Sequence, residues 1–191
     1  GVVHPVTGET INNYRKLASD PVMKPDWTKE FGREFGNIAQ GDKVTGEKGT
    51  NCVFVMTPEE IMNIPSDRVV TYARIVVDYR PQKKNPNRVR ITAGGNLINY
   101  PYELITRTAD LQTTKIMWNS VISTPQARYM CADVKNFYLC TPLDRYEYMR
   151  MPINLIPQEF IDLYGLEPKV KNGYVYMCIV RGMYGLPQSG I

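Results

Sequence analysis

The sequence has few of the residues that build several common functional sites. It contains one histidine, His4, and four cysteines, none of which form a Cys-x-x-Cys pair. A Cys/His zinc site is therefore not expected, because it needs four ligands at suitable spacing and these residues do not provide them. A Ser/His/Asp catalytic set cannot be assembled either, because the single histidine lies near the start of the chain. The cysteines occur in apolar surroundings, which favours buried free thiols over the disulfide framework of a secreted protein.

Long apolar segments are missing as well. No stretch approaches the roughly 20 apolar residues of a membrane-spanning helix, and no basic and apolar leader opens the chain. We therefore expect an intracellular protein with no membrane partner. The chain begins at Gly1 and stops at Ile191, directly after a turn-like segment, so we expect a fragment of a longer reading frame.

The composition is that of a globular protein. Apolar residues make up 43% and charged residues 22% of the 191 positions, which argues against disorder. A chain of this length has room for one domain or for one large part of a bigger one. Its net charge of +4 weakly favours anionic partners.

Hydrophobic periodicity and turn residues predict an α+β fold with mostly antiparallel strands. Residues 1–24 are polar and rich in turn formers. Trp27, Phe31 and further apolar residues at helical spacing predict a helix from Pro25 to just before Gly41. Further predicted helices lie after the N-cap residue Thr57, at 108–123 and at 157–164. Predicted strands lie at 52–55, 69–80, 88–93, 128–134, 146–151 and 173–180.

The segments 69–80 and 88–93 are joined by turn formers, which predicts an antiparallel hairpin. No acidic residue occurs between Tyr79 and Tyr102, whereas the cations there are Arg80, Lys83, Lys84, Arg88 and Arg90. Because Arg88 and Arg90 are two positions apart on a strand, they share one face. Guanidinium groups placed in this way are suited to hold phosphate oxygens. A solvated hairpin tip without a ligand is the alternative interpretation.

Asp133 ends the predicted strand at 128–134. The apolar residues 130–132 precede it, so a carboxylate buried here would need a metal or a cation as partner. A capping or turn aspartate is the alternative. Phe137 and Tyr138 follow at a distance that allows them to form the wall of a pocket beside the carboxylate.

The third informative segment is 181–188, which contains Gly182 and Gly185. Glycine permits tight turns and a close approach of the backbone to a ligand. Taken alone, this pattern is also that of an ordinary loop.

Taken in order, five segments resemble the reverse transcriptases of copia-type LTR retrotransposons, and together they span nearly the whole chain. Residues 14–41 resemble the opening segment of that domain, with its tryptophan helix, and 88–95 are similar to its Lys-Ala-Arg-Leu-Val-Ala-x-Gly hairpin strand. Residues 133–139 resemble the Asp-Val-Lys-x-Ala-Phe-Leu run, the first catalytic motif. The remaining matches are 146–152, similar to an Ile-Tyr-Met-x-x-Pro strand, and 184–188, similar to the Leu-Tyr-Gly-Leu-Lys-Gln motif.

The resemblance implies the fingers (mainly 1–127) and the start of the palm (128–191) of a right-hand polymerase. Its implied partners are an RNA or DNA template with a primer, deoxynucleoside triphosphates, and the rest of a polyprotein with the missing palm, thumb, RNase H and integrase. Its implied location is a cytoplasmic particle, the nucleus, or both. Its implied cofactor is Mg²⁺, as two ions that activate the primer 3′-hydroxyl and neutralise the triphosphate. Asp133 would ligate both ions, with the backbone carbonyl of Val134 as a further ligand.

The resemblance also implies how the nucleotide is held. Arg90, with Arg88 and Lys84, would bind the triphosphate from the hairpin. Tyr138, beside Phe137, would lie under the incoming sugar and select deoxynucleotides, because its ring would clash with a ribose 2′-hydroxyl. Gln188 would contact the nucleotide or the template near the primer end, and nucleic-acid contacts are also implied for Tyr184 and Gly185.

The sequence departs from the family at three points. Phe137 replaces a usually small residue, and Pro187 replaces a lysine. No acidic residue follows Glu167, so the aromatic-x-Asp-Asp hairpin that completes the family's metal site does not lie in this segment. We therefore expect the fragment alone to be inactive.

Three hypotheses follow from the sequence. The first is a fragment of an RNA-directed DNA polymerase. The second is a decayed or co-opted remnant that binds nucleic acid without catalysis. The third is an unrelated metal-dependent hydrolase that uses Asp133, against which the absence of clustered carboxylates or histidines counts.

Overall fold

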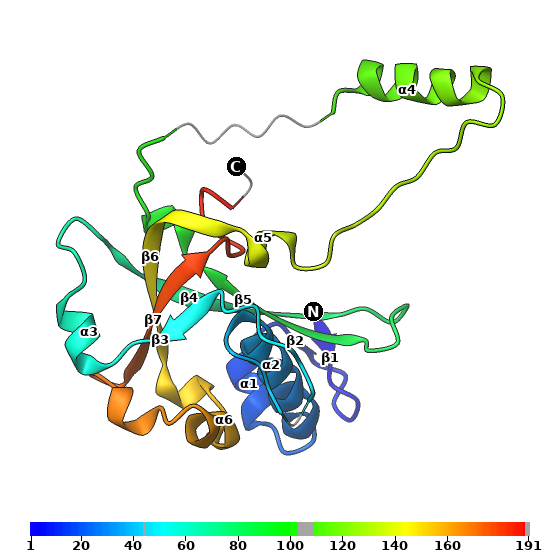
Figure 1. Ribbon diagram of the computed structural model, residues 1–191. Coiled ribbons are helices and arrows are strands. Elements are labelled where there is room, and N and C mark those ends of the chain that lie inside the picture. Colours follow the sequence, from blue (N-terminus) through cyan, green and yellow to red (C-terminus); the bar gives the residue numbers. More distant parts are fainter. Residues whose placement is uncertain (44, 103–108, 190–191) are drawn as a thin grey trace.

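The computed structural model describes residues 1–43, 45–102 and 109–189. This part of the chain contains the strands β1 (Val2–Val3), β2 (Thr10–Ile11), β3 (Val53–Val55), β4 (Val70–Tyr79), β5 (Asn87–Ala93), β6 (Pro142–Pro152) and β7 (Tyr174–Arg181). Its α-helices are α1 (Tyr14–Ser19), α2 (Lys24–Ile38), α3 (Pro58–Met62), α4 (Leu111–Ser123), α5 (Phe137–Cys140) and α6 (Gln158–Leu163) (Figure 1). Short 3-10 turns occur at Gly95–Leu97, Ile153–Leu155 and Glu167–Lys169.

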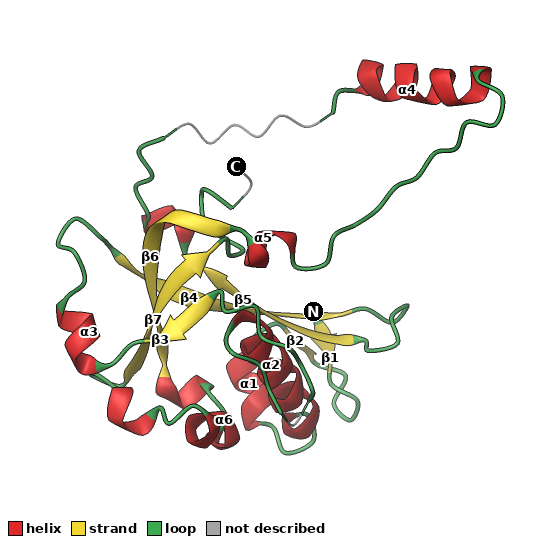
Figure 2. Ribbon diagram, viewed as in Figure 1, coloured by secondary structure: helices red, strands yellow, loops and turns green. Residues whose placement is uncertain are grey.

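One curled sheet with the strand order β3–β7–β6–β4–β5 forms the centre of the molecule. Its neighbouring strands are antiparallel, except that β4 and β6 pair in parallel through residues 70–72 and 148–150. Helices α1, α2 and α6 cover one face, and α3 lies against the other (Figure 2). The predicted α+β class is confirmed, and strands from 1–127 and from 128–191 share the same sheet.

Helix α2 supplies the largest part of the core. Trp27, Phe31, Phe35 and Ile38 recur every three or four residues and are almost completely buried, as the sequence spacing predicts. The Phe31 and Phe35 rings stack with centroids 5.8 Å apart, and the Tyr14 ring of α1 stacks on Phe31 at 5.0 Å. These contacts join α1 and α2 into one unit on the sheet.

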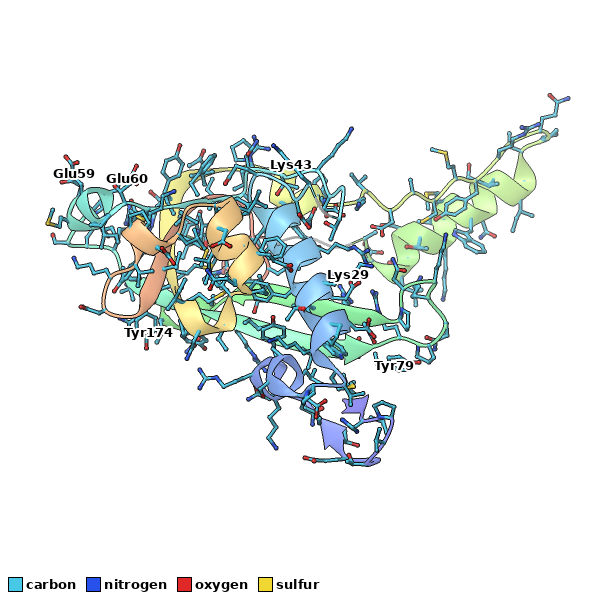
Figure 3. The ribbon with its side chains drawn as sticks, turned by 90° about the horizontal axis from the view of Figure 1, so that it is seen from below. Lys29, Lys43, Glu59, Glu60, Tyr79 and Tyr174 are labelled. Atoms are coloured by element: carbon cyan, nitrogen blue, oxygen red, sulfur yellow. The ribbon has the colours of Figure 1, made fainter. Side chains whose placement is uncertain are left out.

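The predicted hairpin is confirmed as β4 and β5. Their antiparallel register places Arg90 opposite Val76 and Arg88 opposite Asp78, so the two arginines share one face. Alternate residues Val89 and Ile91 point into the core. Figure 3, which labels Tyr79 at the far end of β4, shows α2 lying along this hairpin.

The prediction of a strand at 128–134 is wrong. These residues have no regular secondary structure, and Met130 is 85% exposed. A strand needs a neighbour with which it exchanges backbone hydrogen bonds, and this segment pairs with no strand among the described residues. The prediction came from local composition, which carries no information about such a partner. Asp133 therefore ends no strand, and it is exposed rather than buried.

Helix α4 extends away from the sheet and its covering helices (Figures 1 and 3). It starts after its cap residue Asp110, whose Oδ1 accepts a hydrogen bond from the Thr113 N–H at 2.7 Å. Thr108, the predicted start, lies outside the described residues. No residue of α4 is buried, and its Trp118 is 54% exposed. Within the described ranges no helix is both long and apolar enough to cross a membrane.

The expectation of buried thiols holds for only part of the cysteines. Cys52 is fully buried, and burial raises its pKa to about 12. Cys178 is half-buried, and burial raises its pKa to about 11. Cys131 and Cys140 are exposed, because the chain around 128–140 does not enter the sheet. All four thiols are free.

Candidate functional site

Two hollows hold most of the residues selected from the sequence. The first, the arginine cleft, lies between α2, the β4–β5 hairpin and the segment around Asp133, with a volume of about 370 Å³. Five candidates line it: Arg88, Arg90, Asp133, Val134 and Tyr184. Its other lining residues are Arg33, Glu34, Asn37, Glu47, Arg80, Lys135 and Asn136. The fold thus gathers residues from four distant parts of the chain around one cleft.

Residues next to Asp133 attach its segment to the rest of the cleft. The side-chain amide of Asn136 donates a hydrogen bond to Oδ1 of Asn37 on α2 at 2.8 Å. Nζ of Lys135 lies 3.6 Å from Oε1 of Glu47. The Asp133 carboxylate itself has no ion-pair or hydrogen-bond partner among the described residues. It is therefore available to a ligand in the cleft.

An aromatic row connects the cleft with the second hollow. The guanidinium carbon of Arg90 lies 4.1 Å from the centroid of the Tyr184 ring, a cation–π contact. The Tyr184 and Tyr138 rings meet edge to face at 6.1 Å, and Tyr138 meets Phe137 at 5.8 Å. Four candidate residues therefore form one continuous line of contacts.

The loop after β7 reaches this position by packing its backbone on the end of β5. The carbonyl oxygen of Tyr184 accepts a hydrogen bond from the Ala93 N–H at 2.9 Å. Gly185 has φ +93°, and a Cβ placed on it would lie 2.1 Å from the Ala93 carbonyl oxygen. Only glycine fits there, since it tolerates positive φ and has no side chain. Gly185 thus positions Tyr184. This is a structural reason for a glycine at the second place of the 184–188 motif.

The second hollow, the Tyr138 pocket, has a volume of about 240 Å³. Its lining residues are Tyr100, Phe137, Tyr138, Thr141, Pro142, Leu143, Asp144, Arg145, Gly182, Gln188 and Ser189. Tyr138 is 40% and Phe137 60% exposed, so both rings present a free face. The two aromatics line a pocket as predicted, but this pocket is not beside the Asp133 carboxylate, which lines the arginine cleft instead.

Gln188 lies deeper than the sequence suggests. It is only 7% exposed, and its Nε2 donates a hydrogen bond to Oε1 of the fully buried Glu147 at 3.2 Å. Sequence reasoning missed Glu147. The signal was available, because Glu147, Met149 and Met151 alternate along β6 and all point to the covered face of the sheet.

Two hairpin cations take different places. Lys84 is exposed in the turn between β4 and β5 and lines neither hollow. Arg80 lines the arginine cleft, and its Nε is buried with no hydrogen-bond partner among the described residues. A buried guanidinium N–H without an acceptor favours an anionic ligand.

Glu34 is a second residue that sequence reasoning missed. It lies on α2 against β5, where its Oε1 accepts a hydrogen bond from the Ile91 N–H at 3.3 Å. Burial raises the pKa of its carboxyl to about 7, although the Ile91 N–H and Arg90 favour the ionised form; Glu47 adds to the increase. The cleft therefore contains a carboxyl group that titrates near neutral pH.

This titration predicts a pH dependence of stability. Since Glu34 binds its proton more tightly in the folded state, the free energy of unfolding should fall as pH rises from about 4.5 to about 7 and then level off. The expected loss is roughly 3 kcal/mol, from the change of about 2.5 pKa units at 1.36 kcal/mol per unit. Urea denaturation at a series of pH values measures it. Glu34→Gln should remove this decrease, whereas the exposed Glu59→Gln should keep it; equal profiles for all three proteins would contradict the assignment.

The described residues do not by themselves make a site for two divalent ions. No group of three or more His, Cys, Asp or Glu side chains gathers in a metal-binding arrangement within them. Asp133 offers one carboxylate, whereas Glu47 is paired with Lys135. Hard divalent cations need several oxygen ligands, so further carboxylates are required for the cofactor implied by the resemblance.

Comparison with known proteins adds no relative: no family model, no curated protein and no solved structure matches this chain.

Proposed function

We propose that this chain is the fingers and the first part of the palm of a reverse transcriptase, the polymerase of a copia-type retrotransposon. In its complete form the enzyme adds deoxynucleotides to a primer on an RNA or DNA template. The observation that carries the proposal is the meeting of Asp133 with Arg88 and Arg90 in one cleft, next to the aromatic row. Together with Tyr184 of that row, these residues come from three of the segments that resemble the family.

The arginine cleft suits a triphosphate. The guanidinium of Arg90 lies over the Tyr184 ring. Its N–H groups therefore remain available to donate hydrogen bonds to phosphate oxygens. The unpartnered Nε of Arg80 is a further donor in the same cleft. Lys84, in the exposed turn, would reach the phosphates only through a movement of the hairpin. We therefore propose that it contributes least to triphosphate binding.

Asp133 is proposed as an Mg²⁺ ligand, with the backbone carbonyl of Val134 beside it. Both groups are oxygen donors, as this ion prefers. The remaining carboxylates would come from outside the described residues. We therefore propose activity for the complete polymerase and none for the fragment.

Tyr138 provides the test of this function. In the polymerase encoded by the whole reading frame, RNA-templated primer extension should use deoxynucleotides in preference to ribonucleotides, because the Tyr138 ring excludes a 2′-hydroxyl. Tyr138→Ala should reduce this preference by at least about tenfold, the effect of losing roughly 1.4 kcal/mol of discrimination. The measurement is the ratio of kcat/KM for the two nucleotides. Tyr129→Ala, a change of an exposed tyrosine outside both hollows, serves as control, and an unchanged ratio in Tyr138→Ala would remove the assignment.

Failure of the complete wild-type protein to extend any primer would instead favour the second hypothesis, a remnant that binds nucleic acid. An affinity for a primer–template duplex that falls steeply with rising salt concentration would support that hypothesis, since salt-dependent affinity reports cationic contacts with phosphates.

A further inference from the structure

Glu147 is an acidic residue in the interior of the sheet. It lies on β6 opposite Ile179 of β7 and is fully buried. The family strand that 146–152 resembles has an isoleucine at this place. A buried carboxylate is costly unless it is paired and hydrogen-bonded, so its partners should indicate what it does.

Both partners of Glu147 use the same oxygen. Nε of Arg145 lies 3.0 Å from Oε1 and forms an ion pair with it, but the direction of its N–H does not meet the geometry of a hydrogen bond. Nε2 of Gln188 donates to Oε1 at 3.2 Å. Arg145 is held in turn by a hydrogen bond from its Nη2 to the Asn99 carbonyl oxygen at 3.1 Å.

These contacts determine which way the Gln188 amide points. A carboxylate paired with a guanidinium only accepts hydrogen bonds, so Gln188 must turn its NH₂ group toward Glu147. Its carbonyl Oε1 then faces away from Glu147. That oxygen is buried and has no hydrogen-bond partner among the described residues. Gln188 also lines the Tyr138 pocket.

We propose that Glu147 is a positioning residue, which orients the Gln188 amide so that its carbonyl oxygen accepts a hydrogen bond from the nucleotide in the Tyr138 pocket. This inference rests on the proposed polymerase function for the identity of the ligand. A glutamine without Glu147 would present either its oxygen or its nitrogen. Glu147 removes this ambiguity, and the pocket then favours a ligand with a donor group beside the aromatic row.

The kinetic test is a double-mutant cycle in the complete polymerase. Glu147→Gln and Gln188→Ala should each raise the KM for deoxynucleotide about tenfold, as expected for one lost hydrogen bond to a buried group, and change kcat less than about threefold. If Glu147 acts through Gln188, the double variant is no worse than Gln188→Ala alone. Multiplying effects would overturn the inference. Glu159→Gln, an exposed carboxylate-to-amide change on α6, should match the wild type.

A second measurement does not depend on polymerase activity. In the 191-residue chain, NMR of the ¹⁵N-labelled side-chain amides should show a Gln188 NH₂ group whose hydrogens exchange at least tenfold more slowly than those of exposed glutamines, because one of them is bonded to Glu147. Glu147→Gln should lose this protection. Fast exchange in the wild-type chain would overturn the inference even if both variants failed to fold. Slow exchange without primer extension by the complete protein would refute the proposed function alone and leave the Glu147–Gln188 pairing in place.

Discussion

Replacing Asp133 by asparagine should reduce Mg²⁺-dependent primer extension by at least roughly a thousandfold, the scale on which loss of a central catalytic group acts. The substitution keeps the shape of the side chain and removes its charge. Because Asp133 is exposed and has no partner among the described residues, the fold should not change. Affinity for the primer–template duplex should remain within about twofold, since cationic contacts with phosphates dominate such binding.

Extension kinetics and duplex titration on the same preparations measure these two effects. Asp67→Asn, a neutralised carboxylate that is also exposed and precedes β4, should retain both activities. If Asp133→Asn lost extension and duplex binding together, Asp133 would be structural. If it retained extension, the assignment of Asp133 as an ion ligand would be wrong.

The second large effect concerns the loop that carries Tyr184. Gly185→Ala should lower the free energy of unfolding by about 4 kcal/mol, the sum of strain at positive φ and of overpacking. The new Cβ would lie 2.1 Å from the Ala93 carbonyl oxygen, and backbone on the end of β5 cannot move aside as a flexible side chain can. Urea denaturation followed by circular dichroism measures the loss.

Gly173→Ala is the matched control. Gly173 has φ +79° and no atom within 4 Å of an added Cβ, so this variant carries the strain without the clash and should lose only about 1 kcal/mol. Equal losses in the two variants would contradict the close packing of the 181–188 loop on β5.

The elements with a strong local signal could be predicted from the sequence. Helix α2 has apolar residues at helical spacing, and α3 has a capping box in which Thr57 and Glu60 bond each other's backbone N–H groups. The β4–β5 hairpin has alternating residues on both sides of a turn. Each of these signals lies within about 25 consecutive residues, where local sequence is enough.

Features that depend on distant partners could not be predicted. The segment 128–134 has the composition of a strand but pairs with no described strand. The parallel pairing of β4 with β6 joins residues far apart in the chain, and no local pattern reveals it. In the candidate site, sequence patterns selected Arg90, Tyr184 and Asp133. Glu34 was missed because its importance comes from burial against another element, whereas Glu147 was missed although the alternation of residues along β6 indicated its burial.

The strand order of the central sheet has a consequence for synthesis on the ribosome. Among the described strands β7 is made last, and it lies between β3 and β6, so β3 has no neighbour among these strands until residue 181 has been added. The pair of α2 and the β4–β5 hairpin, in contrast, is complete once residue 93 has emerged. Closing such long loops is entropically costly and slow. A nascent chain therefore exposes the edge of β3 while the residues between β3 and β7 are being made, a period in which chaperones would have an opportunity to bind it.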